Sequence, residues 1–178
     1  MRKLRNEELD RLEVKEYKNT QKLPVCIILD DIRSMHNVGS VFRTSDAFRI
    51  SKVWICGITG QPPHREIHKT ALGATESVSW EYRENVLNLS HELKQEGWSL
   101  ISVEQADQSI KLDKFIPVSD QKYAFVFGNE VFGVKSEVVT ASDHVLEIPQ
   151  FGTKHSLNIS VSCGIVIWDV FQKMNPEF

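Results

Sequence analysis

Short, almost wholly apolar runs are the feature that most restricts how this 178-residue chain can fold. The run Leu23–Leu29, LPVCIIL, has no alternating polar positions that could face water. Such a run is typical of a strand covered on both faces, as strands of a parallel sheet are. We expect further strands at the other short runs, Lys52–Gly57, Ser77–Tyr82, Trp98–Val103, Tyr123–Gly128 and Val145–Ile148.

Segments with a helical spacing of apolar residues lie between these runs. One helix is predicted to begin near Asn37, a favourable N-cap residue. Its buried stripe would be formed by Val38, Val41, Phe42 and Phe48. Another helix is expected over Asn85–Glu96, stopped by Gly97. A last helix, predicted to begin at Leu157, is apolar nearly all round and must be buried on more than one side. This alternation predicts an α/β protein with a largely parallel sheet flanked by helices.

The length is sufficient for one sizeable core. Residues 1–22 carry leucines among many charges, which predicts a short N-terminal helical extension. That extension would pack on the body, bind a partner or fray. Residues 23–178 are expected to form a single domain.

Composition is that of an ordinary soluble globular protein, with 41% hydrophobic and 25% charged residues. No apolar run approaches the roughly 20 residues that span a bilayer, and the charged N-terminus does not resemble a signal peptide. We therefore expect a cytoplasmic protein without a membrane partner. The three cysteines, Cys26, Cys56 and Cys163, lie inside apolar runs and are expected to be buried free thiols.

Positive charge is concentrated in one segment although the net charge is −3. Between Arg33 and Lys69 there are six basic and two acidic residues, so this segment carries +4 and the remainder −7. A basic face on an acidic body favours binding of a polyanion such as a nucleic acid. A solvated surface with a chance cluster of charges fits the pattern equally well.

Two glycine-bearing polar loops follow neighbouring apolar runs near the C-terminus. The loop GNEVFG follows Tyr123–Phe127, and PQFGTKHSLN follows Val145–Ile148. Loops at the carboxyl ends of parallel strands are where α/β sheets bind ligands. The sequence therefore predicts a ligand crevice between these two loops.

Several common ligand sites are excluded by missing motifs. The chain has no G-x-x-x-x-G-K-[ST], no G-x-G-x-x-G after its first strand and no G-x-S-x-G. His155 and Ser156 are adjacent, and adjacency is not a catalytic triad, so a hydrolase is the least favoured interpretation. His64 and His68 have no further ligand at a suitable spacing, so we expect no metal.

Three separated motifs resemble those of one family. They are Asn37-Val-Gly-Ser-Val-Phe-Arg43, Phe127-Gly-Asn-Glu-Val-Phe-Gly133, and Ile148-Pro149 followed by Ser156-Leu-Asn-Ile-Ser-Val-Ser162. In this order and spacing they resemble motifs 1, 2 and 3 of the SpoU/TrmH family in the SPOUT superfamily. The resemblance covers about Pro24 to Phe171, nearly the whole chain.

The resemblance implies a fold and an activity that periodicity cannot reveal. The implied fold is an α/β domain with a C-terminal deep trefoil knot, working as a homodimer whose active site draws on both subunits. The implied reaction is methyl transfer from S-adenosyl-L-methionine to a ribose 2′-hydroxyl of RNA, with tRNA expected ahead of rRNA. A non-catalytic RNA-binding protein that kept the fold is the competing class.

By the same resemblance, individual residues receive roles. The cofactor-binding positions are Val103, Gly128, Ile148 and Leu157. The positions that match catalytic residues are Arg43, Asn37, Glu130, Ser156 and Asn158.

Each of these polar residues also has a structural interpretation. Arg43 could be a surface residue, Asn37 and Ser156 could be N-caps, and Glu130 could be a solvated acid instead of the partner of an arginine across the dimer. Because a guanidinium holds its proton, Arg43 suits a phosphate clamp better than a general base.

Overall fold

The computed structural model describes residues 1–175 and contains one seven-stranded sheet in the order β3-β2-β1-β6-β4-β7-β5. Every neighbouring pair of strands runs parallel, as the apolar runs predicted. The strands are β1 (Leu23–Asp30), β2 (Ile50–Cys56), β3 (Trp80–Arg83), β4 (Trp98–Val103), β5 (Ile110–Lys111), β6 (Lys122–Phe127) and β7 (His144–Glu147).

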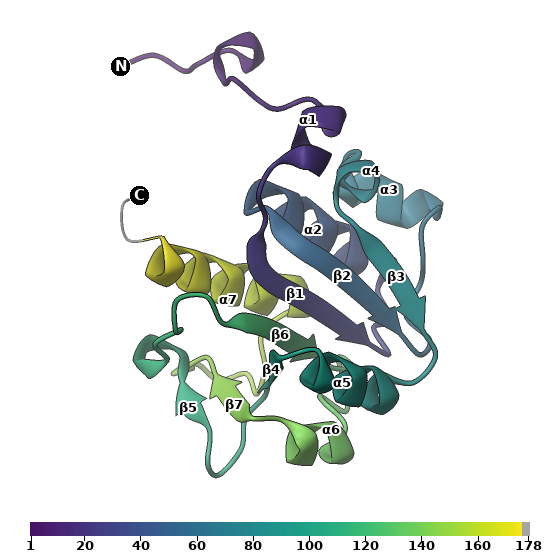
Figure 1. Cartoon of the computed structure of the whole chain (residues 1–178), viewed down its shortest axis with the longest axis vertical. Coiled ribbons are helices and arrows are strands. Elements are labelled where there is room, and N and C mark those ends of the chain that lie inside the picture. The colour runs from purple at the N-terminus through teal and green to yellow at the C-terminus, as the bar shows by residue number, and fades with distance from the viewer. Residues whose placement is uncertain (176–178) are drawn as a thin grey trace.

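Helices cover both faces of the sheet (Figure 1). One face carries α2 (Met35–Ala47) and α7 (Ile159–Met174), which lie side by side, with α1 (Val14–Asn19), α3 (Arg65–Ala71) and α4 (Ala74–Ser77). The other face carries α5 (Val86–Gln95) and α6 (Ser136–Ala141). Short 3-10 turns occur at Asn6–Glu8 and Leu112–Lys114.

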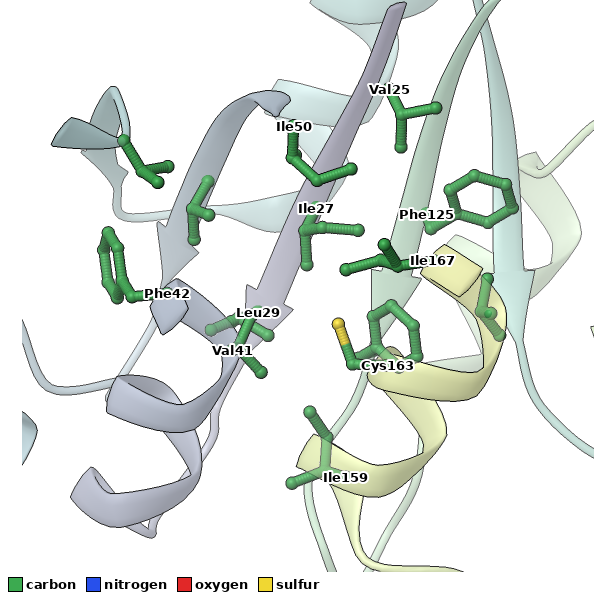
Figure 2. Close-up of a cluster of buried hydrophobic side chains, with 14 of the residues drawn as sticks. Val25, Ile27, Leu29, Val41, Phe42, Ile50, Phe125, Ile159, Cys163 and Ile167 are labelled. Atoms are coloured by element: carbon green, nitrogen blue, oxygen red, sulfur yellow. The ribbon is translucent and has the colours of Figure 1, made fainter. Parts of the chain in front are cut away.

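Strand β1 is apolar throughout because it lies in the middle of the sheet with both faces covered by helices. Val25, Ile27 and Leu29 face α2 and α7, while Cys26 and Ile28 face the α5 side. Figure 2 shows the first three beside apolar residues of both helices. Each fully buried side chain of this size contributes about 1.5–3 kcal/mol relative to exposure. The three cysteines are buried and free, as expected.

Helix starts differ from the sequence expectation. Helix α2 begins at Met35, and Ser34 is its N-cap because the Ser34 hydroxyl accepts from the Asn37 backbone N–H at 3.3 Å. Helix α7 begins at Ile159 with Asn158 as its cap, so the prediction of a start at Leu157 was wrong. The side chains of Asn37 and Ser156, which were candidates for these caps, therefore do not cap the helices.

Two further segments depart from the predicted pattern. Residues 74–77, which precede the third strand, form α4, so that strand begins at Trp80 instead of Ser77. In the N-terminal segment, α1 buries Tyr17 against the body. The leucines of this segment, Leu4, Leu9 and Leu12, are exposed. The trefoil knot remains a prediction of the resemblance.

Close packing of α2 on α3 requires a glycine at position 39. A Cβ there would overlap the Thr70 hydroxyl and the Ile67 carbonyl oxygen. We predict that Gly39→Ala lowers the free energy of unfolding by about 1–3 kcal/mol, because the helices must separate. Chemical denaturation measures this, with Ser40→Ala on the same helix as the control that should change stability little. Equal stability of Gly39→Ala and wild type would contradict the close approach.

Candidate active site

The carboxyl ends of β4, β6 and β7 border a pocket of about 850 Å³. Its walls are residues 103–106, the loop after β6 and the loop between β7 and α7. All four positions expected to bind cofactor line it: Val103, Gly128, Ile148 and Leu157. The two glycine-bearing loops therefore enclose one crevice, as their placement after parallel strands predicted.

The loop after β6 is fixed by the side chain of Asn129. Its Nδ2 donates to the carbonyl oxygen of Asp31 at 2.8 Å, and its Oδ1 accepts from the N–H groups of Val131 and Phe132 at 2.9 and 3.2 Å. A Cβ at Gly128 would overlap the Gly133 carbonyl group, so the loop can fold back only over a glycine. Asn129 thus shapes the loop and ties it to the end of β1.

Glu130 joins this loop to the start of α2. Its carboxylate accepts from the backbone N–H groups of Arg33 at 3.0 Å and Ser34 at 3.1 Å, and from Asn37 Nδ2 at 3.3 Å. Partial burial raises the pKa of Glu130, but these donors outweigh it and hold the pKa below its usual value. Glu130 is therefore not a simply solvated acid. Pairing with an arginine of a second subunit remains a prediction.

Asn158 completes the connection from the third motif. Its Nδ2 donates to Asn37 Oδ1 at 3.1 Å, and its Oδ1 accepts from the backbone N–H and the hydroxyl of Ser160. Asn37 consequently bonds to Glu130 on one side and Asn158 on the other. The capping roles proposed for Asn37 and Ser156 were wrong, since Ser34 and Asn158 cap these helices.

The remaining two candidates occupy different places. Ser156 lines the pocket, and among residues 1–175 no hydrogen bond connects it to a histidine, so a Ser-His pair is not formed. Arg43 is exposed on α2 and is not among the pocket-lining residues. It lies six residues beyond Asn37, about 9 Å further along the helix axis. The structure thus gathers Asn37, Glu130, Ser156 and Asn158 and leaves Arg43 outside.

An ion cluster at the end of β1 was missed by the sequence analysis. Lys135 Nζ lies 3.0 Å from an oxygen of Asp30, which is 1% exposed, and 2.8 Å from one of Asp31. Burial raises the pKa of Asp30, whereas the Lys135 hydrogen bond lowers that of Asp31. Two consecutive acids after a buried strand were the available signal. The cluster ties the β1–α2 connection to the residue that precedes α6.

Metal sites and membrane-spanning helices are both absent from the described part of the chain. No group of three or more histidine, cysteine or acidic side chains is arranged to hold a metal ion there. No helix over those residues is long and apolar enough to cross a membrane.

Fold and pocket define a parallel α/β protein with a pocket between the loops at its strand ends. The sequence profile of the SpoU rRNA methylase family matches residues 24–168. This chain belongs to that family.

Two curated relatives illustrate the range of the family. A 23S rRNA (guanosine-2′-O-)-methyltransferase of Neisseria meningitidis serogroup B is 32% identical over 149 residues, which are 84% of this chain and 58% of that protein. A tRNA (guanosine(18)-2′-O)-methyltransferase of Borreliella burgdorferi is 26% identical over 153 residues, covering 86% and 68%. The chain spans less than two thirds of the length of the first of these.

Solved structures support the fold. The A. aeolicus TrmH/SpoU tRNA modifying enzyme superposes with a TM-score of 0.81 at 23% identity, covering 92% of this chain and 83% of that one. An AdoMet-bound rRNA methyltransferase from Sinorhizobium meliloti gives 0.78 at 22% identity, covering 86% and 59%. The α/β class expected from the sequence is confirmed, and both structures share the fold of this chain.

The Glu130 contacts predict a pH-dependent stability. At pH 7, Glu130→Gln should lower the free energy of unfolding by about 0.5–1 kcal/mol, because glutamine offers one acceptor oxygen where the carboxylate offers two and solvent screens an exposed group. A lowered folded-state pKa stabilises the fold above the unfolded value of about 4.5 and loses that effect as pH falls through the folded pKa. The difference between wild type and variant should therefore be smaller at a pH below the lowered folded-state pKa than at pH 7.

Urea unfolding at fixed protein concentration measures this difference. Glu84→Gln, at an exposed glutamate in the loop before α5, is the control expected to match wild type at both pH values. A Glu130→Gln difference that is constant with pH would contradict the assigned hydrogen bonds.

Proposed function

We propose that this protein is an S-adenosylmethionine-dependent RNA methyltransferase that acts on a ribose 2′-hydroxyl. The observation that carries the proposal is the direct connection between the pocket and α2. Asn158 and Glu130 line the pocket and both bond to Asn37, on the helix that bears Arg43. A methyl-donor pocket and an RNA-facing helix would thus be held in one frame.

The chemical character of the pocket walls suits S-adenosylmethionine. Gly128 contributes a stretch of wall without a side chain, while Val103, Ile148 and Leu157 supply apolar surface. A nucleoside that binds mainly through backbone groups and apolar contacts needs this combination. When bound, S-adenosylmethionine supplies an electrophilic methyl group on a cationic sulfur.

The proposed RNA-binding face includes fewer basic residues than the whole segment from Arg33 to Lys69. Lys52 pairs with Glu81 and lies over the Trp54 ring, on the face of the sheet covered by α5. Arg33, Arg43 and Arg65 are exposed on or beside α2 and α3. These arginines supply the charge that a phosphate backbone requires.

Arg43 is proposed to hold a phosphate of the target nucleotide through its two-pronged guanidinium. This would orient the ribose hydroxyl towards the pocket without requiring Arg43 to give up a proton. Asn37 and Asn158 would fix the hydroxyl's surroundings, and Ser156 would shape the pocket wall beside it. The hydroxyl proton would pass to water or to the target phosphate.

The RNA itself is proposed as tRNA, with rRNA as the alternative. The relatives' names include both kinds of substrate, and the expectation of tRNA comes from the motif resemblance. A cytoplasmic location accompanies this proposal as an expectation.

Arg43→Ala should reduce methyl transfer at least about 100-fold, the scale expected when a group that orients or stabilises the transition state is removed. Affinity for S-adenosylmethionine should stay within about twofold, because Arg43 does not line the pocket. Transfer of a labelled methyl group and calorimetric titration measure the two quantities.

Arg83→Ala is the matched control for this variant. Arg83 is an arginine on β3 paired with Glu81, and its removal should leave both quantities unchanged. Equal loss of affinity and activity in Arg43→Ala would assign Arg43 a structural role. A folded wild type that does not bind S-adenosylmethionine would favour the non-catalytic RNA-binding protein.

A homodimer is proposed from the outward face of α7. Val161, Ile165 and Trp168 follow one another at helical spacing and are 50%, 37% and 47% exposed. The Trp168 ring packs on Phe48 and Phe171, which extends this apolar stripe towards α2. Covering it with the same stripe of a second copy fits a symmetric interface and would bring an Arg43 near the partner's pocket.

Light scattering should give a mass of about 41 kDa, twice the chain mass of 20.4 kDa. Ile165→Glu should shift the protein to the monomer, because a charge would be buried in the interface. The control is Ile116→Glu, the same substitution at a side chain that is 82% exposed in the loop before β6. A monomeric wild type, or an Ile165→Glu variant that remains dimeric, would contradict this interface.

A further inference from the structure

Glu104 is a pocket residue to which the motifs assign no role. It follows β4 directly and lines the pocket beside the predicted cofactor position Val103. One carboxylate oxygen accepts from the Val134 N–H at 3.0 Å, and the other accepts from the Gln105 N–H at 2.8 Å. These two bonds hold the carboxylate at the pocket wall.

The charges around the pocket make Glu104 distinctive. Among the described residues that line the pocket, the charged side chains are Glu104, Glu130 and Glu147, and lysine and arginine are absent. Glu147 forms an ion pair with Lys111 at 2.5 Å and accepts from the Ser109 hydroxyl. Glu130 accepts three hydrogen bonds from the α2 side.

Glu104 has no cation within ion-pair distance in the part of the chain that the structure describes. Over residues 1–175, the donors to its carboxylate are the two neutral backbone N–H groups. The negative charge of Glu104 is thus left without a counter-charge from the protein. A partly enclosed carboxylate of this kind favours a ligand that brings positive charge.

We propose that Glu104 is a specificity-determining residue that makes the pocket prefer S-adenosylmethionine over S-adenosylhomocysteine. The inference rests on the proposed function. In the transfer, the bond from sulfur to methyl carbon breaks, and the ribose oxygen forms the new bond to that carbon. Sulfur keeps the electron pair and changes from a cationic sulfonium to a neutral thioether, while the hydroxyl proton leaves to water or phosphate.

The reaction therefore removes one positive charge from the ligand beside an acidic wall. The protein attracts the substrate form of the cofactor and holds the product form less strongly. Glu104 would thereby assist exchange of the spent cofactor for a new one, a step that often limits turnover.

Calorimetric titration with three ligands tests this: S-adenosylmethionine, S-adenosylhomocysteine and sinefungin, which carries an ammonium group in place of the methylated sulfonium. Wild type should bind the two cationic ligands more tightly than S-adenosylhomocysteine. In Glu104→Gln this preference should fall by about tenfold, the scale of one nearby charge in a partly screened site. Asp107→Asn removes an equal charge from an exposed neighbour that does not line the pocket, and it should leave the preference unchanged.

A purely structural role of Glu104 would give a different result. Loosening the Val134 contact would lower the affinity for all three ligands equally. An unchanged preference in Glu104→Gln overturns the inference. If that variant does not fold, the wild-type preference is measured while NaCl is raised from about 0.05 to 0.5 M, which should reduce it several-fold by screening. A preference insensitive to salt then overturns the inference. Failure of wild type to bind S-adenosylmethionine at all would instead refute the proposed function.

Discussion

One carboxylate and two amides hold the site together. Glu130 accepts from the backbone at the start of α2 and from Asn37, and Asn37 accepts from Asn158 at the start of α7. These residues come from one helix and two loops that are far apart in sequence and follow three different strands. Bonded to one another, they form a rigid frame around the pocket.

The parallel sheet makes this frame possible, because it brings the carboxyl ends of β1, β6, β4 and β7 to the same edge. Two further contacts reinforce that edge: the Asn129 side chain bonds to the backbone of Asp31, and Lys135 bridges Asp30 and Asp31. The edge is therefore stiff where the pocket requires backbone groups at fixed positions. The exposed residues on α2 and α7 do not take part in fixing the pocket. They are the residues proposed to contact RNA and a second subunit.

Much of this arrangement could be predicted from the sequence. Apolar runs located six strands because a strand buried on both faces needs no polar residues, and the glycine-bearing loops located the pocket. Helix caps were misassigned because Ser34 and Asn37, and likewise Ser156 and Asn158, are all good capping residues at nearby positions. Tertiary bonds decide between them: the Asn37 side chain is engaged by Glu130 and Asn158. The Asp30–Lys135 pair spans 105 residues, and no local pattern reports such a contact.

The central claim is that this frame positions a ribose hydroxyl of RNA at a methyl-donor pocket. Mapping 2′-O-methyl groups across tRNA and rRNA from cells that lack the protein, with and without the wild-type chain restored, tests it most directly. The account predicts that at least one ribose mark disappears without the protein and returns with it, and the position of that mark identifies the substrate. An identical set of ribose marks in both kinds of cell would contradict the account.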